Sequence, residues 1–256
     1  PPIIGDDLAG IVVEKGSKVS GFVVGDEVYG MDINLRTAAC ADFAVIHQNR
    51  IAHKPTTLSY EEAAVAPLAA LTALQAFQIG KVKPGSKVLI IGASGGVGTF
   101  AVQIAKAMNA HVTGVCSGRN TRLVEKLGAD DTIDYTQEDF INTDNDFDMV
   151  FDVTSYQSLS SCSSLMNAQG IYVSTGGNGA ALLRLARDTI KPGSQKAKSV
   201  WVNSNTRDLE ILKDYFEQGQ VKPIIDSQFS LENIEEAYVR SKTGRSVGKI
   251  AVKIKC

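Results

Sequence analysis

The stretch that decides the fold is "KVLIIGASGGVGTFAVQIAKAMNAHVTGV", residues 87–115. It opens on the continuous apolar run "KVLIIG", which is typical of a strand buried on both faces of a parallel sheet. A glycine-rich turn follows, and "GVGTFAVQIAKAMN" then repeats apolar residues at helical spacing. "HVTGV" is strand-like again. The stretch therefore predicts a strand, a tight turn, a helix and a second strand that runs parallel to the first.

The same alternation continues downstream. "TRLVEKLG" predicts a second helix, which Gly128 ends as a C-terminal cap. The further strand candidates are "TIDY" (132–135), "DMVFDV" (148–153), "GIYVST" (170–175) and "SVWVNS" (199–204). This βαβαβ rhythm predicts a doubly wound parallel α/β sheet.

The residues before this region have a different character. Residues 8–54 hold four short apolar runs broken by Gly, Asp and Pro, which predict strands: "LAGIVVEKG", "DEVYGM", "ADFAVI" and "RIAHKP". Ser59 and Glu62 then form a capping box at the start of an alanine-rich helical stretch. Pro67 is expected to divide that stretch into two helices. From about residue 221 the chain returns to this earlier character, with an extended segment, an amphipathic helix and the strand "GKIAVKI".

The glycine-rich turn at residues 92–98 is the first candidate site. Gly95 and Gly96 lack a Cβ atom, so the backbone can approach a pyrophosphate closely, and Gly98 lets the helix pack tightly on the strand. The N-terminus of the helix directs unpaired N–H groups and a positive dipole end toward the phosphates. The turn therefore predicts a dinucleotide site, and its cofactor-binding candidates are Ala93, Ser94, Gly95, Gly96 and Val97. The alternative is a tight glycine turn without a ligand.

The residues after the second strand predict which dinucleotide is bound. An Asp or Glu that bonds the adenosine ribose is usual about 20 residues beyond such a turn. This chain has Cys116, Ser117, Gly118 and Arg119 there instead. Ser117 can donate to a 2′-phosphate and Arg119 can fork around it, which is expected to favour NADPH over NADH about ten- to hundredfold. The alternative for Arg119 is a solvated loop cation.

Two other strand ends carry candidate residues. Tyr135, after the third strand, is expected to pack near the adenosine, and the alternative is a half-buried strand tyrosine. The ends at Asp152 and Thr175 fall where open α/β sheets bind ligands, so Thr175 is a further cofactor-binding candidate.

Composition excludes several classes of protein. The 256 residues are 44% hydrophobic and carry a net charge of −2, so a large core is expected, and disorder or nucleic acid binding is not. No apolar run reaches 18 residues, so no membrane span is predicted. The four cysteines form no CxxC pair, which argues against a zinc ribbon or a redox pair. A reducing compartment is expected, and the chain is interpreted as cytoplasmic. The alternative is an organellar location, since any targeting peptide would lie upstream of Pro1.

Three stretches of the chain resemble the medium-chain dehydrogenase/reductase superfamily: residues 1–30, residues 67–98 and "GRSVGKIAVKI" (244–254). The resemblance is stronger to its zinc-independent quinone oxidoreductase branch, the group of ζ-crystallin. It implies a GroES-like β-domain formed by 1–65 and 221–256, and a Rossmann NADP-binding domain formed by 66–220. It also implies that the family's first strands would precede Pro1, so that the GroES-like domain is truncated at its N-terminus.

The resemblance implies roles for further residues. Thr72 is expected near the nicotinamide, with helix packing as the alternative. Lys249 matches a family position near the cofactor, with an exposed lysine as the alternative. No residue presents itself as a catalytic acid or base, and water could supply the proton that reduction of a quinone oxygen requires.

Zinc is not expected. Relatives that bind zinc have a His where Asp6 stands and a Cys where Leu68 falls, and a catalytic zinc needs about three protein ligands. The cysteine-rich structural-zinc segment of such relatives has only Cys40 as a counterpart here. His47, His53 and His111 are scattered along the chain and are interpreted as surface or strand-end residues.

These observations predict an NADPH-dependent reductase of quinones or similar conjugated carbonyls that works without zinc. One alternative is an enoyl or 2-alkenal reductase. An alternative of another class is a non-catalytic NADPH-binding protein, crystallin-like or RNA-binding, as some members of the ζ-crystallin group are. The resemblance also implies a homodimer, with residues 170–204 as the plausible edge region.

Overall fold

The computed structural model describes residues 4–33, 39–142, 146–176, 183 and 194–254. Contacts between Cα atoms divide the chain into two compact units. The first unit is formed by Pro1–Leu71 with Val202–Cys256, and the second by Thr72–Trp201. The sequence-based domain boundaries, at 65/66 and 220/221, lie at other positions than these contact-based ones.

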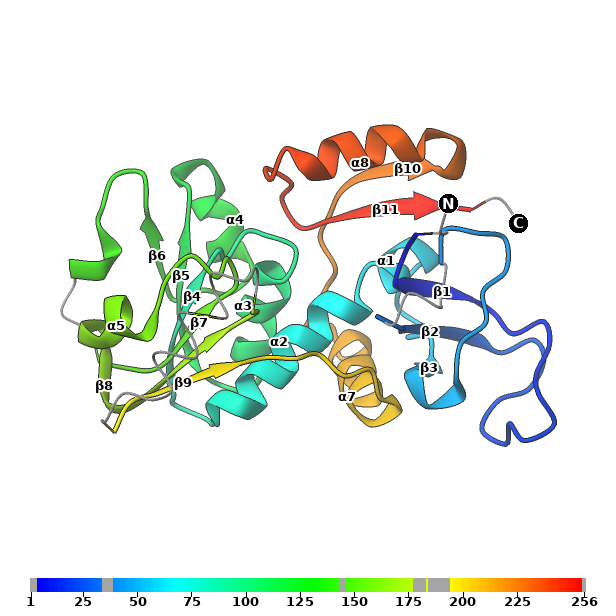
Figure 1. The fold of residues 1–256 in the computed structure, drawn as a ribbon, viewed down its shortest axis with the longest axis horizontal. Helices are drawn as coiled ribbons and strands as arrows, with labels where there is room; N and C mark the ends of the chain where they lie inside the picture. Colours follow the sequence, from blue (N-terminus) through cyan, green and yellow to red (C-terminus); the bar gives the residue numbers. More distant parts are fainter. Residues whose placement is uncertain (1–3, 34–38, 143–145, 177–182, 184–193, 255–256) are drawn as a thin grey trace. The chain divides into compact units, whose positions relative to one another are not determined.

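The described part of the second unit contains a six-stranded parallel sheet with the order β6-β5-β4-β7-β8-β9 (Figure 1). Its strands are β4 (Lys87–Ile91), β5 (His111–Cys116), β6 (Asp131–Asp134), β7 (Phe147–Asp152), β8 (Met166–Ser174) and β9 (Lys196–Ser199). The order runs outward from β4 in one direction and then from β7 in the other. This is the doubly wound arrangement that the sequence predicts, and it puts a ligand crevice beyond the carboxyl ends of β4 and β7.

One helix leads into β4, and further helices and short 3₁₀ turns connect the strands. They are α2 (Pro67–Gly80), α3 (Gly98–Ala107), η2 (Gly118–Asn120), α4 (Thr121–Lys126), η3 (Phe140–Asn142), α5 (Leu159–Cys162) and η4 (Ser163–Leu165). The predicted cap is confirmed, because Gly128 has φ +104° just after α4. The boundary between the two units falls inside α2, between Leu71 and Thr72.

The core of the second unit centres on β4 and β7. Leu89 and Ile90 are completely buried, as the continuous apolar run predicts for a strand covered on both faces. The rings of Phe77 in α2 and Phe151 in β7 meet edge to face at 5.8 Å between centroids. This core fixes the ends of the strands from which the candidate site is built.

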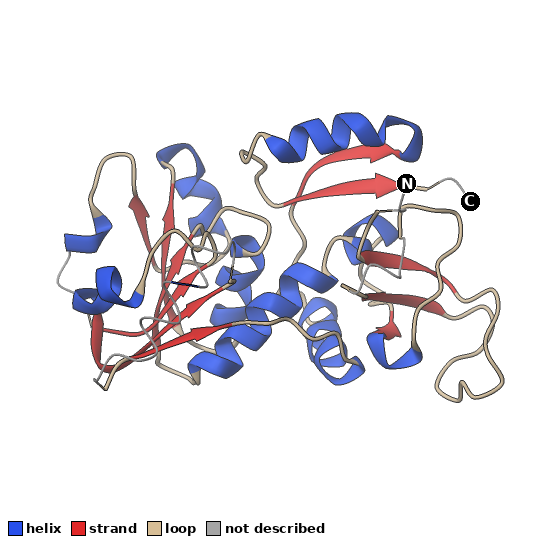
Figure 2. Cartoon of the chain, in the orientation of Figure 1, coloured by secondary structure: helices blue, strands red, loops and turns tan. Residues whose placement is uncertain are grey.

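The first unit contains two small sheets in its described residues (Figure 2). Strands β1 (Asp7–Ile11), β2 (Glu27–Met31) and β3 (Ile51–His53) are antiparallel, while β10 (Ile225–Ser230) and β11 (Lys249–Lys253) form a parallel pair. The other elements are η1 (Gln48–Arg50), α1 (Tyr60–Ala64), α7 (Thr206–Glu217), η5 (Leu231–Asn233) and α8 (Ile234–Lys242). The predicted capping box is confirmed at Ser59 and Glu62, and so is the break between α1 and α2 before Pro67.

Two predicted strands are wrong. "ADFAVI" (41–46) is irregular, and Phe43 and Val45 within it are exposed rather than packed. "SVWVNS" contributes only Ser199 to a strand, since β9 lies earlier, at Lys196–Ser199. Trp201 is 70% exposed. The apolar pattern at 199–204 is misleading because the outer strand β9 forms in the less apolar segment that precedes it.

Helix α7 was not predicted. The side chain of Asn205 caps it by accepting a hydrogen bond from the Asp208 N–H (2.9 Å), and Leu209, Leu212 and Phe216 form its buried face. The Tyr29 hydroxyl donates to the Leu209 carbonyl oxygen (2.6 Å), which ties α7 to β2. These contacts explain why residues 202–220 group with the first unit.

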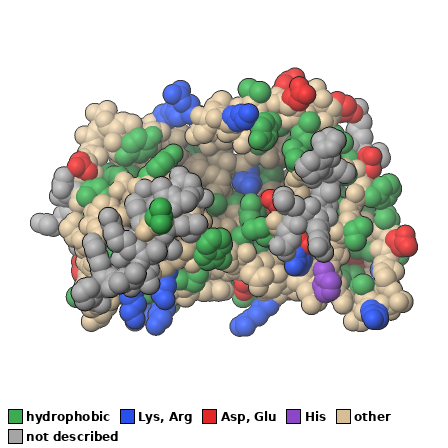
Figure 3. All heavy atoms as spheres, viewed as in Figure 1, with side chains coloured by type: hydrophobic (Ala, Val, Ile, Leu, Met, Phe, Trp, Pro, Cys, Tyr) green, Lys and Arg blue, Asp and Glu red, His purple; other side chains and the backbone are tan. Residues whose placement is uncertain are grey.

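Helix length and surface charge relate to two classes of protein that the sequence argues against, those that span a membrane and those that bind nucleic acid. Among the described residues, every helix is too short or too polar to cross a bilayer. Basic and acidic side chains are both spread over the face drawn in Figure 3, in keeping with the small net charge of the sequence.

Candidate functional site

The glycine-rich turn links β4 to α3 and is held by backbone hydrogen bonds. The N–H groups of Gly92 and Ala93 both donate to the Val115 carbonyl oxygen (3.0 Å each), so the turn is tied to the end of β5. Gly92 has φ +88°, a conformation that other residues rarely adopt. A Cβ atom on Gly98 would overlap with the Gly92 carbonyl oxygen. The close approach of α3 to β4 therefore requires glycine at position 98.

The turn and the start of α3 fit a pyrophosphate. Val97, the N-cap residue, makes no side-chain capping bond to the N–H groups of the first turn. A Cβ atom on Gly95 would touch only the Gly92 carbonyl oxygen, at 3.4 Å, and the turn carries no side chain there. The Thr99 hydroxyl, in the first turn of α3, is buried without a hydrogen-bond partner among the described residues. The Thr99 N–H donates to the Gly95 carbonyl oxygen (3.0 Å), and a helix start that no N-cap side chain covers, beside a backbone without side chains, is typical of an anion-binding site.

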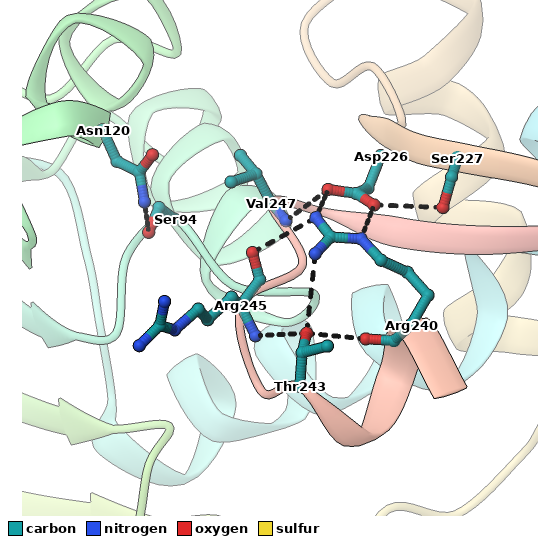
Figure 4. Close-up of polar contacts among 8 residues, drawn as sticks. All are labelled: Ser94, Asn120, Asp226, Ser227, Arg240, Thr243, Arg245 and Val247. Carbon is teal, nitrogen blue, oxygen red and sulfur yellow. Dashed lines mark hydrogen bonds and ion pairs between the residues drawn. The ribbon is translucent and has the colours of Figure 1, made fainter. Parts of the chain in front are cut away.

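The loop after β5 lies against the glycine turn through Asn120. Its amide Nδ2 donates to the hydroxyl oxygens of Ser94 (3.0 Å) and Ser117 (3.3 Å), and Figure 4 shows Asn120 directed at Ser94. The two loops that the sequence assigned to the pyrophosphate and to the adenosine ribose are therefore joined by one side chain. Sequence analysis missed Asn120, and the available signal was an amide side chain three residues after Ser117.

This loop carries Arg119, and an acidic residue from the next strand lies beside it. Arg119 is exposed, and within the described ranges it makes no hydrogen bond or ion pair. Asp134, the last residue of β6, accepts hydrogen bonds at Oδ1 from the N–H (2.9 Å) and hydroxyl (2.7 Å) of Thr136. A Cβ atom on Gly118 would overlap with Asp134 Oδ2. The loop sequence contains no acid, but the fold places one beside it, and sequence analysis missed this residue.

The hydrogen bonds around Asp134 keep its carboxylate ionised. The Thr136 hydroxyl and N–H and the Gly118 N–H hold the pKa of Asp134 below its ordinary value, although partial burial acts in the opposite direction. At the end of β5, burial raises the pKa of Cys116 to about 11, and the charges of Asp134 and Glu125 add to this effect. The Cys116 thiol is therefore neutral near pH 7, and the end of β5 experiences a negative field.

Tyr135 follows Asp134 and lies at the same end of the sheet. Its N–H donates to the Cys116 carbonyl oxygen (3.2 Å), and its side chain is 57% exposed. An aromatic ring that is exposed at the end of β6 is available to pack against a ligand.

A third turn, after β7, completes this end of the sheet. Asp152 is fully buried, and its Oδ1 accepts the N–H (3.0 Å) and hydroxyl (2.6 Å) of Thr154 and the N–H of Ser155 (2.9 Å). Its Oδ2 accepts the Gln157 N–H (2.8 Å) and the Tyr172 hydroxyl (2.9 Å). The turn lies beside the glycine turn, since a Cβ atom on Gly92 would come within 2.8 Å of Thr154 Cγ2.

Thr175 follows β8 and contacts this third turn. Its hydroxyl lies 2.8 Å from the Ser155 hydroxyl and donates to the Val153 carbonyl oxygen (3.1 Å). The structure thus brings most sequence-predicted residues to the carboxyl ends of β4, β5, β6 and β8. These residues are Ala93, Ser94, Gly95, Gly96, Val97, Ser117, Arg119, Tyr135 and Thr175. Thr72 is buried in α2, and the role of each of these residues toward a cofactor stays a prediction.

Lys249 lies in the first unit, on β11, and faces an acidic residue. Its Nζ is 3.7 Å from Asp7 Oδ2, while Asp7 Oδ1 accepts the Leu68 N–H (2.7 Å). Burial raises the pKa of Asp7 to about 6, although Lys249 and the Leu68 N–H act to lower it. Asp6, Asp7 and Lys249 border a cavity of about 1630 Å³ within this unit, between β1, β11 and the segment 39–46.

The positions at which zinc-binding relatives carry ligands lie in the same unit. Leu68 offers no donor side chain, and Cys40 lies beside Gly5, where a Cβ atom would be 3.0 Å from its sulfur. Across the described ranges, no group of three or more His, Cys, Asp or Glu side chains is placed to hold a metal ion. Part of the segment compared with the structural-zinc lobe, residues 34–38, lies outside these ranges.

Two family models match this chain. The model for the alcohol dehydrogenase GroES-like domain matches residues 1–101. The model described as zinc-binding dehydrogenase matches residues 127–252.

Individual proteins are similar over almost the whole chain. The mitochondrial NAD(P)H oxidoreductase RTN4IP1 of Bos taurus is 31% identical, across 99% of this chain and 71% of the relative. The 2-methylene-furan-3-one reductase of Solanum lycopersicum is 33% identical, across 98% of this chain and 63% of the relative. The solved structure of the quinone oxidoreductase from Coxiella burnetii has a TM-score of 0.86 and 30% identity, across 98% of this chain and 79% of that one.

Proposed function

Because the chain belongs to the quinone oxidoreductase branch of the medium-chain dehydrogenase/reductase superfamily, and is similar to proteins named as NAD(P)H and quinone oxidoreductases, we propose that it reduces quinones or similar conjugated carbonyls with NADPH. The observation that carries the choice of NADPH is the loop at Ser117–Arg119. This loop lies against the glycine turn through Asn120, and its guanidinium has no partner among the described residues. A free cation at that position favours a 2′-phosphate.

The cofactor supplies the hydride, and the protein supplies position and polarity. The glycine turn and the start of α3 hold the pyrophosphate, and Ser117 and Arg119 hold the 2′-phosphate. Tyr135 packs against the adenosine. Asn120 fixes the two phosphate-binding loops relative to each other by donating to Ser94 (Figure 4) and to Ser117. Thr72, Thr175 and Lys249 complete the proposed set of residues near the cofactor.

Replacement of Arg119 by Ala tests this assignment. We expect the dissociation constant for NADPH to rise about tenfold or more, because a charge-assisted bond to the 2′-phosphate is lost, and that for NADH to change by less than about twofold. Titration of the intrinsic cofactor fluorescence measures both constants. Arg122→Ala removes the same charge from the exposed face of α4 and is the matched control. Equal changes for NADPH and NADH in Arg119→Ala would contradict the assignment.

The substrate is assigned by comparing acceptors. Steady-state rates with a quinone, a 2-alkenal and an enoyl thioester separate the proposed activity from an enoyl or 2-alkenal reductase. The tomato relative is named as a reductase of a methylene-furanone, which supports the alkenal alternative. Tight NADPH binding without turnover of any acceptor would favour a non-catalytic binding protein.

We also propose that the reaction needs no zinc. Asp6 and Leu68 stand where zinc-binding relatives have ligands, and a leucine cannot coordinate a metal. Metal analysis of the purified protein is expected to find well below one zinc per chain, and activity is expected to survive dialysis against a chelator. A stoichiometric zinc content that chelation removes together with activity would refute this.

Two further proposals concern assembly and location. A homodimer that pairs through the β8–β9 edge of the six-stranded sheet is the proposed assembly, since β9 is the outer strand there. We also propose a cytoplasmic location, although the bovine relative is named as mitochondrial.

A further inference from the structure

Asp134 lies beside the loop that is proposed to hold the 2′-phosphate, so its charge would act on a phosphate bound there. Ser117 and Arg119, the two residues proposed to hold the phosphate, flank Gly118. Asp134 Oδ2 occupies the space that a side chain at Gly118 would need. The carboxylate therefore lies under the middle of the phosphate-binding loop, although it comes from the next strand.

The orientation of this carboxylate is fixed. Oδ1 accepts two hydrogen bonds from Thr136, and the Gly118 N–H also contributes to holding the charged form. Oδ2 is the atom directed to the loop. Fixed charges act more strongly on a ligand than mobile ones, because no side-chain reorganisation is needed when the ligand binds.

The field of Asp134 reaches the loop. Cys116, which immediately precedes Ser117, has its thiol pKa raised by burial and also by the Asp134 charge. Arg119 does not pair with Asp134 in the structure. The loop thus presents a free cation on its outer side and a fixed anion beneath it.

We propose that Asp134 is a specificity-determining residue that weakens the preference for NADPH and allows NADH to bind at the same site. Its carboxylate repels a 2′-phosphate held by Arg119, whereas a ribose 2′-hydroxyl meets an acceptor and no repulsion. This inference rests on the proposed cofactor site. The inference adds that the selectivity between NADPH and NADH is set by two opposing charges, that of Arg119 in the loop and that of Asp134 at the end of β6.

The decisive variant is Asp134→Asn, which keeps the shape and an acceptor for Thr136 but removes the charge. We expect the dissociation constant for NADPH to fall about threefold to tenfold, and that for NADH to stay the same or rise. The effect should shrink as salt is added, because the interaction is with a solvent-accessible ligand charge. Asp134→Glu keeps the charge, and its ratio of the two constants should stay within about twofold of the original.

Asp131→Asn is the matched control. Asp131 begins the same strand, roughly 10 Å from Asp134 along β6, which exceeds the Debye length of about 8 Å at physiological salt. Its replacement is expected to leave the NADPH-to-NADH ratio unchanged. The melting temperature of each variant is measured in parallel, and Asp134→Ser is the second neutral variant if Asp134→Asn fails to fold.

The outcomes separate this inference from the proposed function. If Arg119→Ala weakens NADPH selectively but Asp134→Asn leaves the ratio unchanged, or alters both constants equally, the role of Asp134 is wrong and the cofactor site stands. If the original chain binds neither nucleotide, the proposed function and this inference are both contradicted. A selective gain in NADPH affinity, present in Asp134→Asn and absent in Asp131→Asn and Asp134→Glu, supports the inference.

Discussion

Replacing Gly98 with alanine is expected to destabilise the second unit severely and to abolish cofactor binding. The new Cβ atom would overlap with the Gly92 carbonyl oxygen and come within 2.7 Å of the Ala93 carbonyl carbon. Both atoms belong to the backbone, so no side-chain rotation relieves the clash, and α3 must move away from β4. We expect a loss of about 3 kcal/mol or more in the free energy of unfolding, seen as a melting temperature lower by roughly 6–12 °C.

Gly95→Ala is the matched control for this prediction. A Cβ atom there would meet only the Gly92 carbonyl oxygen at 3.4 Å, an ordinary contact, so the melting temperature is expected to stay within about 2 °C. The methyl group would still stand on the proposed path of the pyrophosphate, and NAD(P)H affinity is expected to fall at least about tenfold. A Gly98→Ala protein with unchanged stability would show that the packing of the helix on the turn is looser than the structure indicates.

Asp152→Ala is the second substitution with a large expected effect. The fully buried carboxylate accepts five hydrogen bonds, from Thr154, Ser155, Gln157 and Tyr172. Its loss would leave these donors without their acceptor, with Ser155 and Tyr172 in the interior, so we expect a destabilisation of roughly 3–5 kcal/mol, measured by urea unfolding. The turn beside Gly92 would also lose its fixed conformation, and cofactor affinity should fall with it.

Asp152→Asn separates the hydrogen bonds from the packing. The amide oxygen can still serve the three donors on Oδ1, while its NH₂ group faces the Gln157 N–H and the Tyr172 hydroxyl. The hydroxyl can turn to accept a bond but the N–H group cannot, so about 1–2 kcal/mol of destabilisation is expected. Equal losses for Ala and Asn would mean that the carboxylate charge, rather than its hydrogen bonds, holds the turn.

The regular elements of the second unit were predictable because their periodicity is strong. The buried run at 87–91 and the apolar face of 98–107 both agree with β4 and α3. The position of β9 was not predictable. The sequence predicts a strand at 199–204, but β9 lies in "KAKS" (196–199), an edge strand that alternates charged and small residues. Helix α7 had a readable cap at Asn205 and an apolar face, and it could have been predicted from them.

The candidate site was predictable only where its residues are neighbours in sequence. The glycine turn carries its own geometry, since Gly92 and Gly98 are needed locally. Asn120 and Asp134 act on residues 26 and 16 positions away, Ser94 and Gly118, and only the parallel pairing of β5 with β4 and β6 brings them together. An acid-free loop sequence therefore does not imply an acid-free site.

Direct titration of the purified chain with NADPH and NADH tests the central claim, which is that the glycine turn and the Ser117–Arg119 loop together bind a phosphorylated dinucleotide. Calorimetry is expected to show one NADPH bound per chain, more tightly than NADH, with a difference that depends on Arg119. A chain that is folded, as judged by its circular dichroism and cooperative melting, and yet binds neither nucleotide would contradict the account.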